Sequence, residues 1–186
     1  MSTHLIKLEE AGKRYISQRF TLEISKKDFL VISGANGTGK TTLLLMILGF
    51  IYPDSGQIHK RKLKIGYVPE KVMLPPFVDV FEYLKTMAKI KKDQLDMRLV
   101  HLFEIPLDHK IHELSKGNQQ KIAIITALMG RPDLIIFDEP LSGLDESMQD
   151  VFFDVISSYY EQGVGMMVST HEPNRFIGLA TKHIRL

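Results

Sequence analysis

The sequence contains no cysteine among its 186 residues. Without thiols the chain cannot form disulfides, thiolate metal sites or a cysteine nucleophile, and this absence suits a reducing compartment. The sequence also has little excess of one charge over the other, because 24 basic and 22 acidic residues leave a formal net charge of only +2. So small an excess, with the basic residues scattered along the chain, argues against a nucleic-acid partner.

Long apolar runs are missing as well. The longest, LLLMILGFIY at 43–52, contains a glycine and is about half of the roughly 20 residues that span a bilayer. The first residues, MSTHLIKLEE, lack the charged-then-apolar pattern of a signal peptide. We therefore expect no membrane-spanning segment and a cytoplasmic location.

The chain instead has the composition of an ordinary globular protein, 44% hydrophobic and 25% charged. Two or three strands are predicted in residues 1–33, and a hairpin at 57–68 is predicted to return to the sheet. The apolar runs in LIIFDEP and GMMVST predict buried strands on either side of a helix at about 146–161. Strands that alternate with helices predict an α/β fold with a largely parallel sheet.

Residues 75–113 have helical character. Asp79 followed by Glu82 predicts an N-cap acceptor with a capping glutamate, and apolar residues recur at helical spacing over 93–105. A further helix is predicted at 119–129.

These patterns predict a single domain over residues 1–186. Its catalytic core would comprise about 1–74 and 121–186, with a helical lobe of about 75–120 inserted between them.

A glycine-rich turn, GANGTGKT at 34–41, fits the phosphate-loop pattern. Glycines let the backbone curl tightly and approach phosphates without Cβ atoms in the way. The backbone amides at the start of the following helix then point at the β- and γ-phosphates. Lys40 supplies a point charge and the Thr41 hydroxyl a Mg²⁺ ligand. The residues predicted to bind nucleotide here are Gly34, Asn36, Gly37, Thr38, Gly39, Lys40, Thr41 and Thr42.

Acids and a histidine end the two buried strands. Asp138, at the end of LIIFD, is predicted to hold the Mg²⁺ shell, and Glu139 to orient and polarise the attacking water. His171 follows the strand GMMVST, and we expect it to point into the same crevice and contact the γ-phosphate.

Taken together, these elements resemble the ATP-binding-cassette (ABC) family in order and over nearly the whole chain. GANGTGKTT looks like its Walker A loop and LIIFDEP like its Walker B strand with the catalytic glutamate. LSKGNQQK at 114–121 resembles the ABC signature, SGLD at 142–145 the D-loop, and His171 the switch histidine. The resemblance implies a P-loop NTPase (RecA-like) core, an N-terminal antiparallel β subdomain and an inserted helical subdomain.

The resemblance also implies a head-to-tail pair of cassettes with two ATP molecules between them, as a homodimer or with a related cassette. In such a dimer Ser115 and Gly117 would cap the γ-phosphate bound by Lys40 of the other chain. Asp145 would lie across the interface and sense the partner's site. Tyr15, expected at the end of an early strand, matches the family's adenine-stacking aromatic, although an exposed tyrosine at a strand edge would look the same in the sequence.

Two residues depart from the family pattern. Glu70 stands where the family usually has a glutamine that touches Mg²⁺ and the attacking water. A carboxylate still ligates Mg²⁺, but it adds negative charge beside the γ-phosphate. Lys116 replaces a usual glycine, and it either adds a cation near the partner's phosphates or faces solvent.

The function implied is the ATP- and Mg²⁺-binding ATPase subunit of an ABC transporter, peripheral on the cytoplasmic face of the membrane. A separate multi-span permease would dock against the loop from Glu70 to Asp79. The residues SKG, followed by glutamines, are similar to signatures of bacterial exporters and predict export. The alternative is a soluble mechanical ABC ATPase, although those often carry two fused cassettes or a coiled-coil insertion. A small-molecule P-loop kinase would leave 114–121 and 142–145 without a role.

Overall fold

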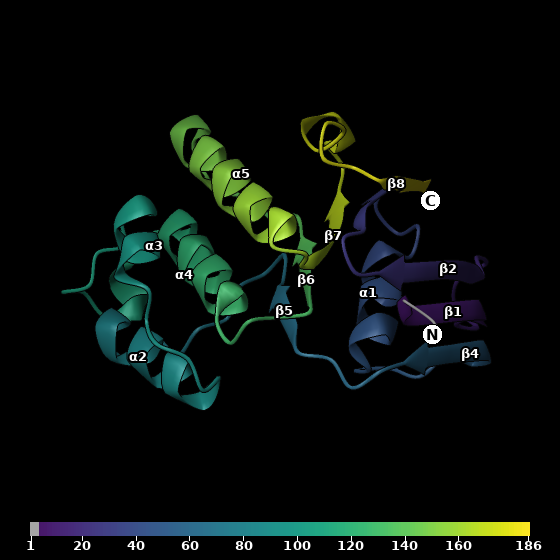
Figure 1. Cartoon of the computed structure of the whole chain (residues 1–186), viewed down its shortest axis with the longest axis horizontal. Helices are drawn as coiled ribbons and strands as arrows, with labels where there is room; N and C mark the ends of the chain where they lie inside the picture. The colour runs from purple at the N-terminus through teal and green to yellow at the C-terminus, as the bar shows by residue number, and fades with distance from the viewer. Residues whose placement is uncertain (1–3) are drawn as a thin grey trace.

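The computed structural model describes residues 4–186, and the first three residues of the predicted domain lie outside that range (Figure 1). Its centre is a sheet of five strands in the order β5-β6-β7-β3-β8, in which every neighbouring pair is parallel. The strands are β3 (Phe29–Ser33), β5 (Ile65–Val68), β6 (Leu134–Asp138), β7 (Gly165–Thr170) and β8 (Lys182–Arg185).

A second, antiparallel sheet has the order β2-β1-β4. Its strands are β1 (His4–Gly12), β2 (Phe20–Ser25) and β4 (Ser55–Lys60). Helix α1 (Lys40–Leu48) lies between this sheet and the parallel one (Figure 1). The predicted α/β class, with a largely parallel sheet and an antiparallel β layer from the N-terminal part of the chain, is confirmed.

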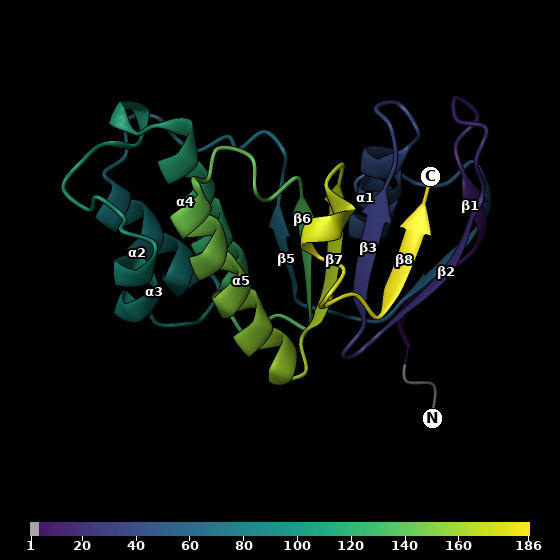
Figure 2. The same cartoon turned by 90° about the horizontal axis from the view of Figure 1, so that it is seen from above.

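The parallel sheet is buried on both faces, and its side chains alternate between two cores. In β6, Ile135 and Phe137 face one core, whereas Leu134 and Ile136 face the other. The first core is covered by α4 (Lys116–Leu128) and α5 (Glu146–Glu161), and the second by α1 and the antiparallel sheet (Figure 2). The uninterrupted apolar runs in the sequence therefore correctly predicted strands that are buried on both faces of the sheet.

Helices α2 (Val80–Ile90) and α3 (Met97–Leu102) lie beside α4, away from the parallel sheet (Figure 2). Two 3₁₀ turns, η1 (Ile111–Glu113) and η2 (Pro173–Arg175), complete the helical segments in the described residues. Asp79 is the N-cap residue of α2, as predicted, but its side chain makes no capping hydrogen bond. Glu82 instead pairs with Lys85, one helical turn on, at 3.5 Å.

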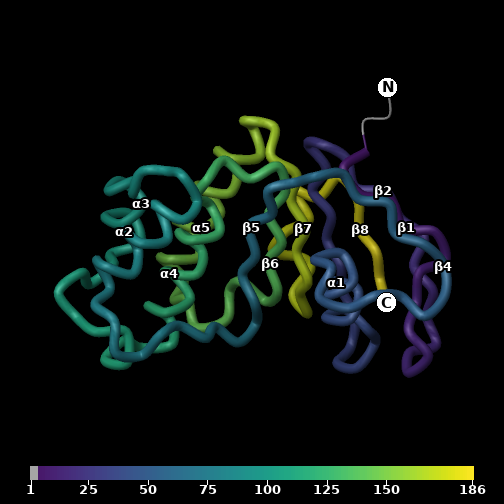
Figure 3. Tube along the Cα trace, turned by 90° about the horizontal axis from the view of Figure 1, so that it is seen from below, coloured from purple at the N-terminus to yellow at the C-terminus, as the bar shows by residue number. Residues whose placement is uncertain are grey.

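The predicted hairpin at 57–68 is wrong. β4 pairs with β1 in the antiparallel sheet, whereas β5 pairs with β6 in the parallel sheet. Figure 3 shows the trace crossing from β4 in one sheet to β5 in the other. The alternating pattern identifies both strands, but their partners are distant in sequence, so local turn chemistry cannot assign them. The edge strand β8 was not predicted.

Gly66 allows β5 to lie directly against the end of α4. A Cβ atom at this position would stand 2.1 Å from the backbone oxygen of Ala127, and backbone cannot move aside as a side chain can. We expect Gly66→Ala to lower the free energy of unfolding by about 1–3 kcal/mol, measured by urea denaturation. Gly178→Ala is the matched control, because a Cβ there meets no atom within 4 Å. Equal stability of the two variants would contradict this packing.

Candidate functional site

A cleft of about 570 Å³ lies at the carboxyl ends of the parallel strands, where open α/β sheets bind their ligands. Its volume is within the range of small-molecule sites. The cleft brings together residues from the phosphate loop, the ends of β6 and β7, and the segment after β5. Its lining residues are Tyr15, Ile16, Asn36, Gly37, Gly39, Lys40, Thr41, Thr42, Glu70, Asp138, Glu139, Ser142 and His171.

The phosphate loop ends at an uncapped helix N-terminus. The residues Gly37 and Gly39 have φ angles of 83° and 100°, in the left-handed region that glycine adopts without strain. Gly39 is the N-cap of α1, and it provides no capping side chain. The first turn of α1 also holds no acidic residue. The orphan N–H groups and the positive end of the helix dipole are therefore left for an external anion.

Lys40 is the cation of this loop. Its side chain is buried, and its Nζ donates to the carbonyl oxygens of Gly34 and Ala35 at 2.7 and 3.1 Å. An ammonium group has three N–H donors, so one remains for a ligand. Burial makes this charge more effective than a surface lysine would be, because solvent screens it less.

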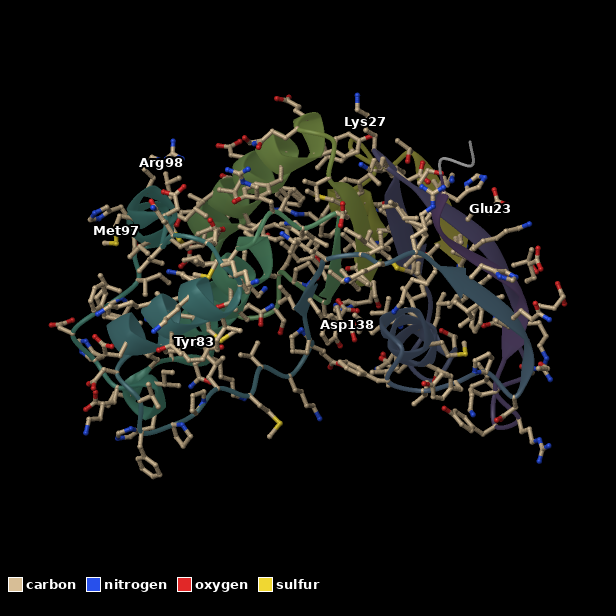
Figure 4. The ribbon with its side chains drawn as sticks, turned by 60° about the horizontal axis from the view of Figure 1, so that its bottom comes forward. Glu23, Lys27, Tyr83, Met97, Arg98 and Asp138 are labelled. Carbon is tan, nitrogen blue, oxygen red and sulfur yellow. The ribbon has the colours of Figure 1, made fainter. Side chains whose placement is uncertain are left out.

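The carboxylates of Asp138 and Glu70 line the same cleft as the phosphate loop. Asp138 ends β6, and Figure 4 places it between α1 and the group formed by α2, α3 and α4. Burial raises the pKa of its carboxyl above the ordinary value, and the negative charge of Glu70 acts in the same direction. Burial, with the charges of Asp138 and Glu70, also raises the pKa of Tyr67 to about 12. Negative charge is thus concentrated at this point, where a cation would be stabilised.

The side chains of Thr41, Asp138 and Glu70 fit Mg²⁺ only together with ligands from water and phosphate. Within residues 4–186, no three His, Asp or Glu side chains form a cluster that would hold a metal by themselves. Mg²⁺ is usually bound by one or two carboxylates together with waters and substrate phosphates. Thr41, Asp138 and Glu70 provide a hydroxyl and two carboxylates in the same cleft as the loop. The donor set therefore suits a nucleotide-bound Mg²⁺ ion.

Glu139 and His171 form an ion pair at the mouth of the cleft. His171 Nδ1 lies 2.8 Å from Glu139 Oε2, while the imidazole is 66% exposed and the carboxylate 16%. Glu139 has a φ angle of 49°, which is uncommon for a residue other than glycine. Its N–H donates to the Ser169 carbonyl at 2.9 Å, and this bond holds the residue at the end of β7.

The contact between Glu139 and His171 predicts how the imidazole of His171 titrates. The hydrogen bond and charge of Glu139 raise the pKa of His171 above 6.5. The imidazolium form therefore persists to higher pH than in a free histidine. We expect an NMR titration of the imidazole protons to give a pKa above 6.5, and a lower value in Glu139→Gln. The same His171 pKa in both proteins would mean that the two side chains do not pair in solution.

Three further residues that were predicted to bind nucleotide, Gly34, Thr38 and Tyr15, differ in whether they line the cleft. Gly34 and Thr38 are not among the residues that line the cleft. A Cβ at Gly34 would stand 2.6 Å from the Leu186 carbonyl oxygen, so this glycine serves close packing. The Thr38 hydroxyl donates to the Ala35 carbonyl at 2.9 Å. Tyr15 lines the cleft, but it lies in the turn after β1 rather than in the strand.

Ser115, Gly117 and Asp145 do not line this chain's cleft. Ser115 is the N-cap of α4, and its Oγ accepts a hydrogen bond from the Asn118 N–H at 3.2 Å. Asp145 is the N-cap of α5, where its Oδ1 accepts from the Met148 N–H at 2.9 Å and from the Ser147 hydroxyl at 2.7 Å. These hydrogen bonds lower the pKa of Asp145. Asp145 thus has a local structural role that its place in SGLD did not reveal.

Sequence reasoning missed two residues of the cleft, Ile16 and Ser142. Ile16 follows Tyr15, and its apolar side chain borders the same part of the cleft. Ser142 opens SGLD, and its N–H donates to the Glu139 carbonyl at 3.2 Å, which brings it next to the acids. The turn from Glu139 to Ser142 brings these two residues together. No pattern in the sequence marks this serine as part of a cleft.

Comparison with known proteins identifies relatives over most of the chain. A family model described as "ABC transporter" matches residues 17–142. The zinc import ATP-binding protein ZnuC of Pseudomonas fluorescens is 29% identical over 181 residues, which cover 92% of this chain and 69% of that protein. The ZnuC of Vibrio parahaemolyticus is 37% identical over 80% of this chain and 58% of its own length.

An uncharacterized ABC transporter ATP-binding protein of Methanocaldococcus jannaschii, MJ1023, is 33% identical over 87% of this chain and 64% of its own length. This chain thus spans 58–69% of the three relatives. Two of them are named for import, so the exporter-like character predicted from the signature is not supported.

Solved structures share the fold. An ATP-binding subunit of an ABC transporter has a TM-score of 0.88 at 23% identity, over 98% of this chain and 85% of that one. A dimeric post-hydrolysis state of the ATP-binding cassette MJ0796, bound to ADP and Pi, has a TM-score of 0.85 at 23% identity, over 97% and 94%. Among residues 4–186, no helix combines the length and apolar character needed to cross a membrane.

Proposed function

Because this chain belongs to the ABC transporter family of ATP-binding proteins, we propose that it binds Mg²⁺-ATP in the cleft and hydrolyses it to drive a separate membrane permease. The observation that supports this proposal best is the convergence of Lys40, Asp138 and the Glu139–His171 pair on one cleft. A purely structural phosphate loop would not need a histidine–carboxylate pair opposite it. The ATP-binding subunits of this family are ATPases, and the proposal assigns that activity to these residues.

Each side chain has a distinct part in the proposed chemistry. The amides at the start of α1 and the Lys40 ammonium bind the β- and γ-phosphates. Thr41, Asp138 and Glu70 hold Mg²⁺, which neutralises phosphate charge when it is bound. Glu139 accepts a hydrogen bond from the attacking water and polarises it, and His171 keeps the Glu139 carboxylate in place. Tyr15 and Ile16 border the part of the cleft proposed for the adenine.

The signature residues are proposed to complete the cleft of a second cassette. Ser115 and Gly117 stand at the N-terminus of α4, where a small hydroxyl and a bare amide suit an anion. They are absent from their own chain's cleft, so the γ-phosphate they cap would belong to a partner. The dimeric structure of MJ0796 has the same fold, which makes a paired arrangement available to this chain.

Ser115→Arg tests this arrangement. The bulky cation is expected to block closure of the dimer and reduce ATPase activity on the order of 10²–10³-fold, as loss of a transition-state contact does. ATP affinity of the monomer should remain unchanged. Ser158→Arg is the control, because it adds the same side chain to an exposed position far along α5. Weaker ATP binding by the Ser115→Arg monomer would assign the signature to its own chain's site.

The proposed permease contact is the loop from Glu70 to Asp79. It contains two large apolar side chains that are open to solvent, Met73 at 92% and Phe77 at 78% exposure. The Phe77 ring contacts His112 in η1, with ring centroids 5.6 Å apart and ring planes tilted by 55°, so the loop is held to the turn just before the signature segment. A helix of the permease that covers this loop would therefore touch the helical lobe of about 75–120 that we propose from the sequence.

Co-purification tests the transporter proposal. Tagged protein should be isolated from detergent-solubilised membranes together with a multi-span chain, and Met73→Asp with Phe77→Asp should release that chain. A catalytically inactive Glu139→Gln protein should still retain it. Recovery of the native protein without any multi-span chain would favour the soluble mechanical ATPase. Import is the direction favoured by the named relatives, and the cargo would be selected by the permease.

A further inference from the structure

Helix α4 packs its first two turns against the segment that follows Glu139. The Gln120 side chain is buried, with 4% exposure, and its Nε2 donates to the Pro140 carbonyl oxygen at 3.2 Å. One turn earlier, a Cβ on Gly117 would stand 2.3 Å from the Gly143 carbonyl oxygen. The helix therefore touches the segment at two points, one through a hydrogen bond and one through backbone contact.

Glu139, the acid proposed to activate water, directly precedes this segment. Glu139 is held in a left-handed conformation by its N–H bond to Ser169 and by the Ser142 N–H bond to its carbonyl. Pro140 comes next, and its ring fixes φ, so a shift of Pro140 passes to Glu139 rather than being absorbed between them. Pro140 is buried. A buried carbonyl needs a hydrogen-bond donor, and Gln120 provides it.

We propose that Gln120 is a positioning residue, which holds the Pro140 peptide and thereby places the Glu139 carboxylate for the attacking water. The proposal rests on the proposed ATPase function of the cleft. Gln120 does not line the cleft, so its effect is transmitted through the backbone of Pro140.

The position of Gln120 gives this contact a second consequence. α4 begins at the signature, with Ser115 as its N-cap, and reaches Pro140 about one and a half turns later. A displacement of the helix start would move the Gln120 amide and the Gly117 contact together. Gln120 thus connects the residues proposed to cap a partner's nucleotide with the residue proposed to act on this chain's own nucleotide.

Gln119 provides a matched contrast on the same helix. Its Nε2 donates to the carbonyls of Ile111 and Leu114, at 3.4 and 3.3 Å, on the side of α4 that faces η1. Gln119→Leu and Gln120→Leu therefore each remove one amide and leave backbone carbonyls without that donor. Only Gln120→Leu leaves a carbonyl next to Glu139, that of Pro140, without its donor.

The experiment compares these two variants with wild-type full-length protein. Gln120→Leu is expected to lower kcat for ATP hydrolysis about ten- to a hundredfold, since small displacements of a positioned group cost this much. The KM for ATP and the affinity for a fluorescent ATP analogue should stay within about twofold, because the phosphate loop is unchanged. Gln119→Leu should lower kcat by less than Gln120→Leu does, because the Ile111 and Leu114 carbonyls that lose their donor lie far along the chain from Glu139.

A spectroscopic readout separates positioning from a general loss of structure. The imidazole proton signals of His171 should shift in Gln120→Leu, because Glu139 moves, and remain in place in Gln119→Leu. If Gln120→Leu does not fold, Gln120→Met replaces it with a linear side chain of similar length. Equal kcat values and equal His171 signals in the two variants would overturn the proposal. An inactive wild-type protein would instead refute the proposed function, and the His171 signals would still test the placement of Glu139.

Discussion

Glu139→Gln is expected to lower ATP hydrolysis about 10²–10⁴-fold while ATP still binds. The amide keeps the shape of the side chain, but it is too weak a base to draw a proton from water. The phosphate loop, at the other side of the cleft, is not altered by this change. Phosphate release measures the loss, and a fluorescent ATP analogue measures the retained binding.

The same variant should accumulate as a nucleotide-bound dimer, because hydrolysis would no longer separate the two chains. Gel filtration with Mg²⁺-ATP measures this directly. Glu172→Gln is a close control, since Glu172 Oε1 lies 3.5 Å from His171 Nε2, on the other nitrogen of the imidazole. Equal loss of activity in both variants would show that the histidine merely needs a negative neighbour. A Glu139→Gln protein that elutes as a monomer would argue against a sandwich of two identical chains.

Lys40→Ala is expected to weaken ATP binding on the order of a hundredfold. Charged hydrogen bonds contribute about 1.5–3 kcal/mol each, and every 1.4 kcal/mol is a factor of ten. The change also removes the bonds from Nζ to the Gly34 and Ala35 carbonyls, which hold the loop in its present shape. Isothermal titration with ATP measures the loss.

Lys60→Ala is the control at the opposite end of the same helix. Lys60 Nζ also donates to two carbonyls, those of Ile47 and Leu48, both at 3.1 Å. Its removal should reduce stability and leave ATP affinity close to that of wild type. If both variants lose affinity to the same extent, the effect comes from destabilised α1 rather than from a phosphate contact.

The parts of the fold that sequence predicted well were those set by local pattern. The apolar runs of β6 and β7 and the helix α5 at Glu146–Glu161 agree with their predicted segments. α4 begins at Lys116, three residues before its predicted start, because Ser115 acts as the N-cap. α3 is shorter than the predicted 93–105, since Asp96 caps a helix of only Met97–Leu102.

The candidate site divides in a similar way. The residue types of the phosphate loop and of the acids after β6 were recognisable because chemistry demands them at close spacing. Their convergence on one cleft depends on β3, β6 and β7 being neighbours in the sheet, although Ser33 and Asp138 are about 100 residues apart. No local rule reports such a neighbour, because strand order is decided by how the whole chain packs.

By itself, therefore, the sequence determined the family and most of the elements and indicated the two halves of the candidate site, since these depend on residue types at short spacing. Only the tertiary structure decided that β4 and β5 join different sheets and that His171 pairs with Glu139. The same holds for Gln120, which is one of two adjacent glutamines in LSKGNQQK and differs from Gln119 only in the carbonyl it meets. Hydrogen bonds between distant segments select their partners by position in space, and that position exists only in the packed chain.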